Sequence, residues 1–438
     1  MQKNSVIKGF SKLNRDEKIR LLMEYLKPSD QVEINLNRYL HPTDQSLFDD
    51  ISENTVSNYY LPFSLAPNFL VNDQMYIVPM VIEESSVVAA ASKAASFWAK
   101  NGGFQVRVKD TIKNGQLFFQ WNGPVSLLQE HSNQIENIIE KASSEATINM
   151  RARGGGITGF EIKPIDNMNN TYQLLVKFKT ANSMGANFIN TCLELISTPL
   201  MDFINTTPAL NKFGQAEHIM SILSNYTPEC VVECKVECSI EQLAPYSGTF
   251  SPQEFAKRFK TGVDIAINDP YRAVTHNKGI FNGIDAVVLA TGNDFRAVEA
   301  GAQAFAARSG QYRSLTHCKI DENTFTYTLE VPLALGTVGG LTNIHPMVKN
   351  AFEILGNPGA EELMRIVAAA GMANNFGAVT SLVTTGIQKG HMKLHLGNIL
   401  TALNATEEQK TKALAFFADQ TVSYSAVQTF LEETKQKA

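Results

Sequence analysis

The chain has 438 residues, of which 44% are hydrophobic and 18% charged, and its formal net charge is -5. This length predicts two or three domains, and the composition is typical of a globular protein rather than a disordered one. Because basic residues are not in excess, we expect neither nucleic acid nor an anionic membrane surface as a partner.

The first residues, Met1 to Leu13, contain no apolar run of the kind that a secretion signal needs. Two stretches without acidic or basic residues, 331–348 and 366–388, are interrupted by glycine together with proline or asparagine. Such residues suit a tightly packed protein interior better than a bilayer. We therefore expect buried segments, no membrane anchor and a cytoplasmic protein.

The first elements have clear boundaries. A polar helix is predicted over Arg15–Leu26 and ends before Pro28. A second helix is predicted after Glu84, capped by Ser85 or Ser86, and it ends at Gly102 and Gly103. Alternation then predicts strands over 105–109 and 116–121, which Asn114-Gly115 would join as a hairpin.

A compact α+β module follows from this alternation. After the two strands we expect a helix over 125–146, strands over 157–165 and 172–180, and a helix over 182–203. This module, residues 104–205, is flanked by helical sequence. We therefore predict that it is inserted into a large, mostly helical domain, and the predicted divisions are 1–103, 104–205, 206–385 and a helical tail, 386–438.

Three of the five cysteines, Cys230, Cys234 and Cys238, are spaced by four residues. They alternate with Glu233 and Glu237 in the pattern of a strand that has one apolar face. Along such a strand, which rises about 3.3 Å per residue, cysteines four residues apart would lie about 13 Å from each other, which is too far for a shared metal or a disulfide. We therefore predict buried, reduced cysteines, with no disulfide and no metal.

Two glycine-containing segments are candidates for a nucleotide. Gly154, Gly156 and Gly159 fit the spacing G-x-G-x-x-G, but they precede a strand instead of joining a strand to a helix. The segment 182–187 has the better context, because it follows a strand and opens a helix whose free N–H groups favour a pyrophosphate. The same pattern is equally typical of a helix that begins with small residues for packing.

Residues 269–299 combine charged and amide side chains with glycines and an apolar run, Ala286–Ala290, which we expect to be a strand. Charged groups next to a buried strand indicate a site, because an unpaired charge beside a core is costly. The alternative is a helix cap with a salt bridge between Lys278 and Asp294. The polar residues of this segment are Arg272, His276, Asn277, Lys278, Asn282, Asp294 and Arg296.

In this segment, His276-Asn277-Lys278-Gly279-Ile280 and Thr291-Gly292-Asn293-Asp294 closely resemble motifs of 3-hydroxy-3-methylglutaryl-coenzyme A (HMG-CoA) reductase, in particular its class II form. Three further motifs are similar and appear in the family's order, so that the resemblance covers nearly the whole chain. They are Val78-Pro79-Met80 through Glu84 to Ala91, the segment 182–187, and Gly390-His391-Met392.

The resemblance implies a reaction and a set of catalytic residues. The family reduces a thioester to an alcohol by two hydride transfers from a nicotinamide, through a hemithioacetal and an aldehyde. Lys278 matches the lysine that stabilises the oxyanion, and Glu84 matches the proton donor, which we expect burial to keep protonated. Asp294 matches the aspartate that tunes both, and His391 matches the acid that protonates the coenzyme A thiolate.

A pairing of His391 with His395 on a metal is the alternative for this part of the chain. We do not favour a metal, because no glutamate lies between the two histidines and no third ligand is evident.

The resemblance also implies binding residues. Ser86, Arg272, Asn282 and Asn375 match positions that hold the hydroxymethylglutaryl group, and an arginine suits its carboxylate. From its local sequence alone, Asn375 could equally be an amide that packs between helices. The nucleotide would lie on Asn182, Ser183, Met184, Gly185, Ala186 and Asn187.

The chain departs from the family's usual pattern at three places. Glu53 to Ser57 lacks a usual glycine, and Ser85 replaces a proline that often follows the glutamate. Asn182 stands where the family commonly has aspartate, and a neutral residue would not repel the 2′-phosphate of NADP. We therefore predict NADPH as the preferred coenzyme over NADH, with nearby basic candidates for the phosphate at Lys177, Lys179, Arg151 and Arg153.

The resemblance as a whole implies an HMG-CoA reductase that makes mevalonate for isoprenoid biosynthesis, and that works as a homodimer or a multiple of dimers. The large domain would bind the substrate, the inserted module the nucleotide, and the C-terminal tail would be a flap that carries His391. Two alternatives are a catabolic enzyme that oxidises mevalonate with NAD and a catalytically silent protein that binds acyl-CoA.

Overall fold

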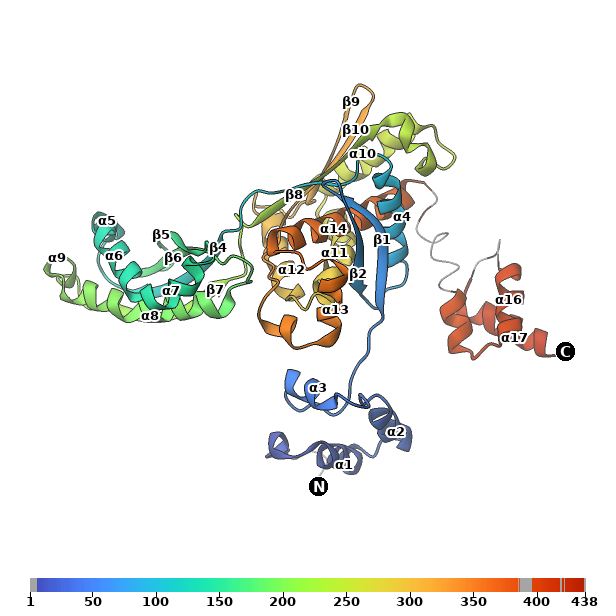
Figure 1. Ribbon diagram of the computed structural model, residues 1–438, viewed down its shortest axis with the longest axis horizontal. Coiled ribbons are helices and arrows are strands. Elements are labelled where there is room, and N and C mark those ends of the chain that lie inside the picture. The colour runs from blue at the N-terminus through green and yellow to red at the C-terminus, as the bar shows by residue number, and fades with distance from the viewer. Residues whose placement is uncertain (1–5, 385, 387–395, 418–419, 421, 437–438) are drawn as a thin grey trace.

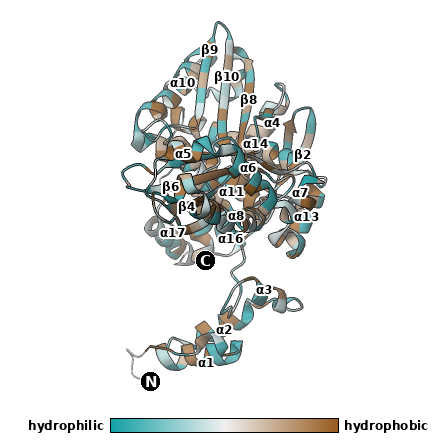
Figure 2. Cartoon of the chain, turned by 90° about the vertical axis from the view of Figure 1, so that its left-hand side faces the viewer, coloured by the Kyte–Doolittle hydropathy of each residue, from teal (hydrophilic) through white to brown (hydrophobic). Residues whose placement is uncertain are grey.

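The computed structural model describes residues 6–384, 386, 396–417, 420 and 422–436. Its N-terminal part is helical, with η1 (Phe10–Lys12), α1 (Arg15–Leu26), α2 (Asp30–Arg38) and α3 (Gln45–Ile51). Asn14 and Glu17 form a reciprocal capping box at the start of α1, so the predicted first helix is confirmed. These helices lie at one end of the molecule, beyond the segment that leads into β1 (Figures 1 and 2), and the Phe48 ring of α3 contacts the ring of His345, with centroids 5.6 Å apart.

The larger part of the molecule contains a β-hairpin and an antiparallel sheet in the order β3-β8-β10-β9. Helices α4, α10, α11 and α14 pack around this sheet and the hairpin (Figure 1). The strands are β1 (Phe63–Val71), β2 (Gln74–Val81), β3 (Gln105–Val108), β8 (Val231–Ser239), β9 (Thr316–Asp321) and β10 (Thr324–Pro332). The helices are α4 (Val87–Ala99), η2 (Ile240–Tyr246), α10 (Pro252–Asn268), α11 (Pro270–Ala290), α12 (Phe295–Ala306), η3 (Gly340–Asn343), α13 (Pro346–Ile354) and α14 (Ala360–Val383).

The smaller part is a second antiparallel sheet, in the order β5-β6-β4-β7, against which the long helix α8 packs. It has its own hydrophobic core, which includes Trp121, Phe178 and Leu193. Figure 1 shows it to one side of the larger part. Its elements are β4 (Lys113–Gln120), α5 (Val125–Glu130), α6 (Ser132–Ala142), α7 (Ser144–Arg151), β5 (Gly156–Pro164), β6 (Thr171–Lys179), α8 (Ala186–Thr206), α9 (Pro208–Asn211) and β7 (Glu217–Ser224).

The predicted hairpin across Asn114-Gly115 is wrong. Both residues lie inside β4, where they pair with Lys177 and Val176 of β6, whereas β3 pairs with β8 in the other sheet. Gly115 serves helix packing instead of a turn, because a Cβ atom there would lie 2.7 Å from Cγ2 of Ile189 on α8. The glycine of this Asn-Gly pair is therefore explained by close packing against α8 and not by a turn.

The predicted strand over Ala286–Ala290 is also wrong, because these residues form the last turns of the helix α11. Its start carries ordinary helix signals: the side chain of Asp269 accepts a hydrogen bond from the N–H of Arg272, and Pro270 is the first residue. Gly283 lets α11 approach α14, since a Cβ atom there would lie 2.3 Å from the carbonyl oxygen of Ala370. A short apolar run does not distinguish a buried strand from a buried helix.

The two sheets divide the chain differently from the predicted module. The smaller sheet runs from Lys113 to Ser224, so β7 extends beyond 205, and the first predicted strand of the module is β3 of the larger sheet. The domain division at 104 and 205 therefore stays a prediction, while the strands of the smaller sheet begin at residue 113 and end at residue 224. The α+β class, with a smaller α+β unit between two segments of a larger one, is confirmed.

Two buried segments agree with their predictions. The strand with three cysteines is β8 and its preceding residue, and Cys230, Cys234 and Cys238 are buried with reduced sulfurs. Among the described residues α14 is the one helix long and apolar enough to cross a membrane, but 72% of its most apolar window is buried inside the protein. Residues of this helix thus form part of the larger core. The tail contains α16 (Glu407–Phe416) and α17 (Tyr424–Gln436), which share a small core of their own.

Candidate active site

The centre of the site is an ion pair between Lys278 and Glu84. Lys278 lies on α11, and Glu84 lies in the turn between β2 and α4; the Nζ and Oε2 atoms are 2.6 Å apart. The two residues are 194 positions apart in the chain. Lys278 thus pairs with Glu84 and Asp294 with Arg296, which excludes the alternative of a salt bridge between Lys278 and Asp294. The lysine and glutamate that the resemblance implies are brought together.

The expected burial of Glu84 is wrong. Its side chain is 36% exposed and that of Lys278 is 59% exposed. Glu84 therefore forms an accessible ion pair instead of occupying an apolar pocket. A substrate that approaches this pair would meet an ammonium group and a carboxyl group side by side.

Asp294 lies at the N-terminus of the next helix, α12. Its Oδ1 atom accepts hydrogen bonds from the N–H groups of Arg296 and Ala297, and both carboxylate oxygens contact the guanidinium of Arg296. Partial burial acts to raise the pKa of Asp294, but these hydrogen bonds and the Arg296 charge outweigh it and hold the pKa below its ordinary value. Within the described chain its carboxylate is thus bound to α12 and not to Lys278 or Glu84.

Three side chains predicted to hold the substrate have polar ends that bind no other described residue. They are the guanidinium of Arg272, the amide of Asn282 and the hydroxyl of Ser86. Asn282 lies one helical turn after Lys278 on α11. Partial burial lowers the pKa of Arg272, and the Tyr327 hydroxyl nearby opposes this. Free donors of this kind on and near α11 suit a substrate with a carboxylate and a hydroxyl.

Ser86 has an unusual backbone. It precedes the first residue of α4 with φ at 76° and ψ at -19°, in the left-handed region. A residue that is not glycine pays a conformational cost there, and such strain is common at functional sites. Its side chain does not cap α4, so the predicted capping role is wrong and the hydroxyl stays free.

Asn375 is in a different position from the other predicted binding residues. It is 1% exposed on α14, and its Nδ2 atom donates to the carbonyl oxygen of His276 at 2.9 Å. Its Oδ1 atom accepts a short hydrogen bond from the hydroxyl of Tyr327. Both ends of this amide are therefore occupied inside the protein, as the alternative of a packing amide requires, and its role in substrate binding stays a prediction.

The segment 182–187 opens α8 at the junction of the two sheets. Gly185 has φ at 96°, and a Cβ atom there would lie 2.4 Å from Cγ2 of Thr180, so only glycine fits this turn without displacement. Ala186 is the first residue of α8, and Asn187 is exposed. The hydroxyl of Ser183 donates to the carbonyl oxygen of Thr180 and closes the turn. A glycine at this position leaves the helix N-terminus open to a phosphate group.

Sequence reasoning missed a lysine beneath this turn. Lys113 is 4% exposed, and its Nζ atom donates to Oγ1 of Thr180 at 2.7 Å and to the carbonyl oxygen of Ser183 at 3.3 Å. Burial lowers its pKa. Lys113 stands at the start of a strand that alternates like any other, so no local signal distinguishes it.

Asn182, the residue predicted to influence coenzyme choice, forms two hydrogen bonds outside its own segment. The Oδ1 atom accepts a hydrogen bond from the N–H of Ala360 at the start of α14, at 3.0 Å, and the carbonyl oxygen accepts one from the N–H of Thr337. The side chain therefore binds the larger part of the protein. Its predicted effect on coenzyme choice stays a prediction.

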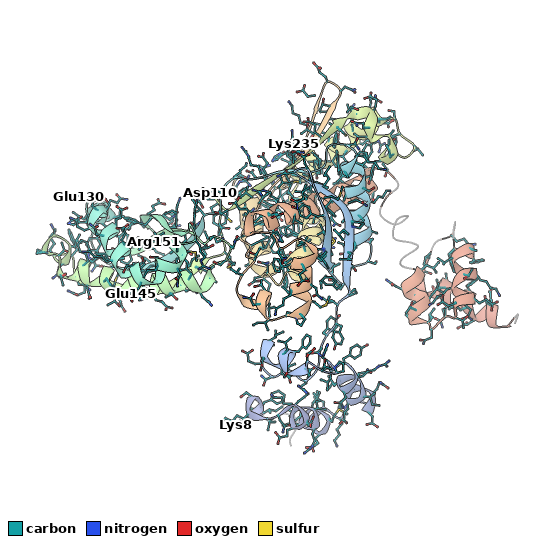
Figure 3. The ribbon with its side chains drawn as sticks, viewed as in Figure 1. Lys8, Asp110, Glu130, Glu145, Arg151 and Lys235 are labelled. Atoms are coloured by element: carbon teal, nitrogen blue, oxygen red, sulfur yellow. The ribbon has the colours of Figure 1, made fainter. Side chains whose placement is uncertain are left out.

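The basic candidates for a 2′-phosphate differ in their contacts. Lys177 pairs with Glu229 and Lys179 with Asp110, which lies where the chain passes between the two parts (Figure 3). Arg153 donates to the carbonyl oxygen of Asn149. Among these four basic side chains, within the part of the chain described, only Arg151 at the end of α7 has no partner (Figure 3).

The predicted thiolate acid, His391, lies outside the described residues, as do Gly390, Met392 and His395. Gly154, Gly156 and Gly159 lie before and within β5, not between a strand and a helix, which agrees with the rejection of a Rossmann motif. Among the residues that the structure does describe, no group of three or more possible metal ligands is found.

The arrangement defines a class of protein. It is an α+β enzyme with an ion-paired lysine and glutamate in its larger part, and with a helix that begins after a glycine turn in its smaller part. The family model described as "Hydroxymethylglutaryl-coenzyme A reductase" matches residues 15–396. The chain belongs to the HMG-CoA reductase family.

Individual relatives agree with this assignment. The 3-hydroxy-3-methylglutaryl-coenzyme A reductase of Archaeoglobus fulgidus is 35% identical over 412 residues, which are 93% of this chain and 89% of that protein. A probable reductase of this name from Borreliella burgdorferi is 31% identical, over 86% of this chain and 84% of its own length.

Solved structures show the same fold. A class II reductase from Streptococcus pneumoniae, bound to NADPH in open conformations, has a TM-score of 0.71 and 35% identity, and covers 87% of this chain and 100% of its own. Another structure of the enzyme from this organism has a TM-score of 0.72 and 34% identity, over 98% of this chain and 100% of its own.

Proposed function

We propose that the chain reduces HMG-CoA to mevalonate and free coenzyme A, with two successive hydride transfers from NADPH. The observation that carries this proposal is the pair of Lys278 and Glu84, 2.6 Å apart, with the free polar ends of Arg272, Asn282 and Ser86 on the same elements. Family membership supplies the reaction, and these side chains supply the groups that it needs.

Each side chain has a chemical task in the proposed reaction. The ammonium of Lys278 would stabilise the negative charge that develops on the thioester oxygen and later on the aldehyde oxygen. Glu84 is the ionised partner of Lys278 in the free protein, so it would take up a proton when the substrate binds and then give that proton to the developing alkoxide oxygen. Arg272 would bind the substrate carboxylate with two parallel hydrogen bonds, and Asn282 and Ser86 would bind its remaining oxygens.

Two further residues keep the roles that the resemblance implies. Asp294 would adjust the charge around Lys278 once substrate is bound, and its pKa below the ordinary range keeps it ionised at neutral pH. His391 would protonate the departing thiolate and so prevent its return to the aldehyde. Asn375 would support the site from the interior, as its burial indicates.

The turn at Gly185 fits a dinucleotide. Its backbone is unobstructed by a side chain, and the N-terminal N–H groups of α8 favour the negative charge of a pyrophosphate. The bound NADPH would supply the hydride. We propose Arg151 as the residue for the 2′-phosphate, because its guanidinium is free while Lys177 and Lys179 are paired with acids.

We further propose a cytoplasmic protein that acts as a homodimer or a multiple of dimers. The support is the class II fold of the solved relatives and the 48.2 kDa chain without a basic excess. Light scattering coupled to size-exclusion chromatography measures the assembly directly.

The test of the function measures NADPH and NADH oxidation with HMG-CoA and, in parallel, mevalonate formation. We expect turnover with NADPH, and replacement of Lys278 by alanine should reduce kcat at least a hundredfold because it removes the charge at the oxyanion. Lys260→Ala is the matched control, since Lys260 forms an exposed ion pair with Asp264 on α10. Mevalonate oxidation with NAD and no reduction would favour the catabolic alternative, and ligand binding without turnover would favour a silent acyl-CoA-binding protein.

A further inference from the structure

The two residues before the catalytic lysine are buried polar residues that the proposed mechanism does not use. His276 is 1% exposed and Asn277 is fully buried, whereas the side chain of Lys278 is 59% exposed. Buried polar groups are costly unless hydrogen bonds satisfy them. Their partners therefore indicate what these residues do.

His276 is bound from two sides. Its Nε2 atom lies 2.6 Å from Oγ1 of Thr316, at the start of β9, and its carbonyl oxygen accepts a hydrogen bond from Nδ2 of Asn375 on α14. The Tyr327 hydroxyl on β10 lies 3.0 Å from the same Thr316 oxygen and also donates to Asn375. A hydrogen-bonded ring of His276, Thr316, Tyr327 and Asn375 thus joins α11 to β9, β10 and α14.

Asn277 binds the segment that leads into β9. Its Oδ1 atom accepts a hydrogen bond from the N–H of Leu315 at 3.0 Å, and its Nδ2 atom donates to the carbonyl oxygen of Arg313 at 2.9 Å. These bonds continue the attachment of the previous residue. Hydrogen bonds therefore attach two consecutive residues of α11, His276 and Asn277, to β9 and to the segment before it.

The group is uncharged. Burial, followed by the nearby Arg272 guanidinium, lowers the pKa of His276 to about 3, so the imidazole is neutral at physiological pH. Burial also raises the pKa of the Tyr327 hydroxyl. The Nδ1 atom of His276 has no partner among the described residues, which favours the proton on Nε2, where Thr316 can accept it.

We propose that His276, Asn277, Thr316 and Tyr327 are positioning residues that set the rotation of α11 about its axis and thereby aim Lys278 at Glu84 and the substrate. Apolar packing leaves a helix free to rotate slightly, whereas hydrogen bonds are directional and fix it. Successive residues differ by 100° around a helix, so any rotation is passed directly to the next residue, Lys278. A displacement of about 1 Å at a catalytic group can lower the rate about a hundredfold.

The test uses two variants of Thr316 that differ in one group. Thr316→Val keeps the shape and removes the hydroxyl, and Thr316→Ser keeps the hydroxyl. We expect kcat for HMG-CoA reduction to fall about tenfold in Thr316→Val and to stay within twofold in Thr316→Ser, while KM for NADPH is unchanged. The control is Tyr172→Phe, which removes a buried hydroxyl that donates to the carbonyl oxygen of Gly123 in the smaller sheet.

A second measurement separates this inference from the proposed function, on which the kinetic arm rests. Amide hydrogen exchange should become faster in the peptide that contains residues 272–281 of Thr316→Val, and not in Thr316→Ser or Tyr172→Phe. If the wild-type protein shows no turnover, the proposed function fails, and the exchange result still decides the positioning role. Unchanged kcat and unchanged exchange in Thr316→Val, or an equal loss in Thr316→Ser, would overturn the inference.

Discussion

At the scale of single residues, an unusual feature near the site is a pair of carboxyl groups, Asp285 on α11 and Glu299 on α12. The Oδ1 atom of Asp285 is buried and has no hydrogen-bond partner in the described chain, while the two carboxyl groups lie within hydrogen-bond reach. Burial, followed by the charges and contact of Glu299 and then the charge of Glu83, raises the pKa of Asp285 to about 8. The folded protein therefore keeps a proton that the unfolded chain loses near pH 4.

This proton makes stability depend on pH in a defined direction. Between about pH 4 and 8 the folded state binds the additional proton, so the free energy of unfolding should fall as pH rises. The change Asp285→Asn, which resembles the protonated acid, should remove a slope of up to about 1.4 kcal/mol per pH unit. Urea unfolding at pH 5, 6.5 and 8, values chosen across that window, measures it.

The control is Asp264→Asn, because Asp264 is exposed and paired with Lys260 on α10. Its slope should equal that of the wild type. If the free energy of unfolding of Asp285→Asn depends on pH as steeply as that of the wild type, the pKa of Asp285 is not raised in the folded protein and the prediction is wrong.

At the scale of elements, the start of α14 is capped by a side chain from the other part of the protein. Asn182 provides the acceptor for the N–H of Ala360, and Gly359, the residue before α14, has no side chain to do so. Helix N-termini have unpaired N–H groups, so an acceptor there stabilises the helix. The turn that begins the predicted nucleotide site is thus also a tertiary cap.

The change Asn182→Ala should lower the free energy of unfolding by about 1 kcal/mol, as the loss of a helix cap usually does. Asn182→Asp should not lower it, since a carboxylate keeps the acceptor and interacts favourably with the helix dipole. Neither change should alter the ratio of kcat/KM for NADPH to kcat/KM for NADH by more than about twofold. This factor corresponds to about 0.4 kcal/mol, the size of the coupling expected between groups that do not touch. Thermal unfolding and coenzyme kinetics measure both quantities.

Asn169→Ala is the control for this prediction, because Asn169 is an exposed asparagine in the connection between β5 and β6, outside the predicted nucleotide segment. A strong shift toward NADH in Asn182→Asp would contradict the capping interpretation. It would mean that the charge at position 182 selects the coenzyme.

At the scale of the whole molecule, the two sheets have separate cores. Leu193 belongs to the core of the smaller sheet and Leu329 to that of the larger, and both are fully buried. Two chain segments connect the sheets, with ion pairs of Asp110 with Lys179 and of Glu229 with Lys177 beside them, and Asn182 adds its hydrogen bonds to the larger part. Exposed or half-exposed ion pairs of this kind contribute little, so each core should determine its own stability.

We therefore predict two unfolding transitions in calorimetry. Leu193→Ala and Leu329→Ala each remove a buried side chain and should each cost about 3 kcal/mol in their own core. Each variant should lower the melting temperature of one transition and leave the other unchanged. A single transition that both variants shift equally would mean that the two cores unfold as one unit.

The sequence by itself determined the boundaries of isolated elements, and the resemblance of its motifs indicated candidate residues for the site. The helix Arg15–Leu26 and the strand with Cys234 were predictable because local signals, a cap and an alternation, act within a few residues. The identities of Lys278 and Glu84 followed from the motif resemblance. Their contact across 194 positions did not follow from local pattern, because only folding brings them together.

Only the tertiary structure decided how glycines and buried polar residues are used. Asn114-Gly115 has the local form of a turn, yet the approach of Ile189 on α8 places this glycine inside a strand. Asn182 has the form of a ligand-binding residue, yet its oxygen binds the N–H of Ala360. His276 and Asn375 likewise read as site residues, and their hydrogen bonds lie inside the protein. A residue's chemistry is local, but its partner depends on packing between segments that are far apart in the chain.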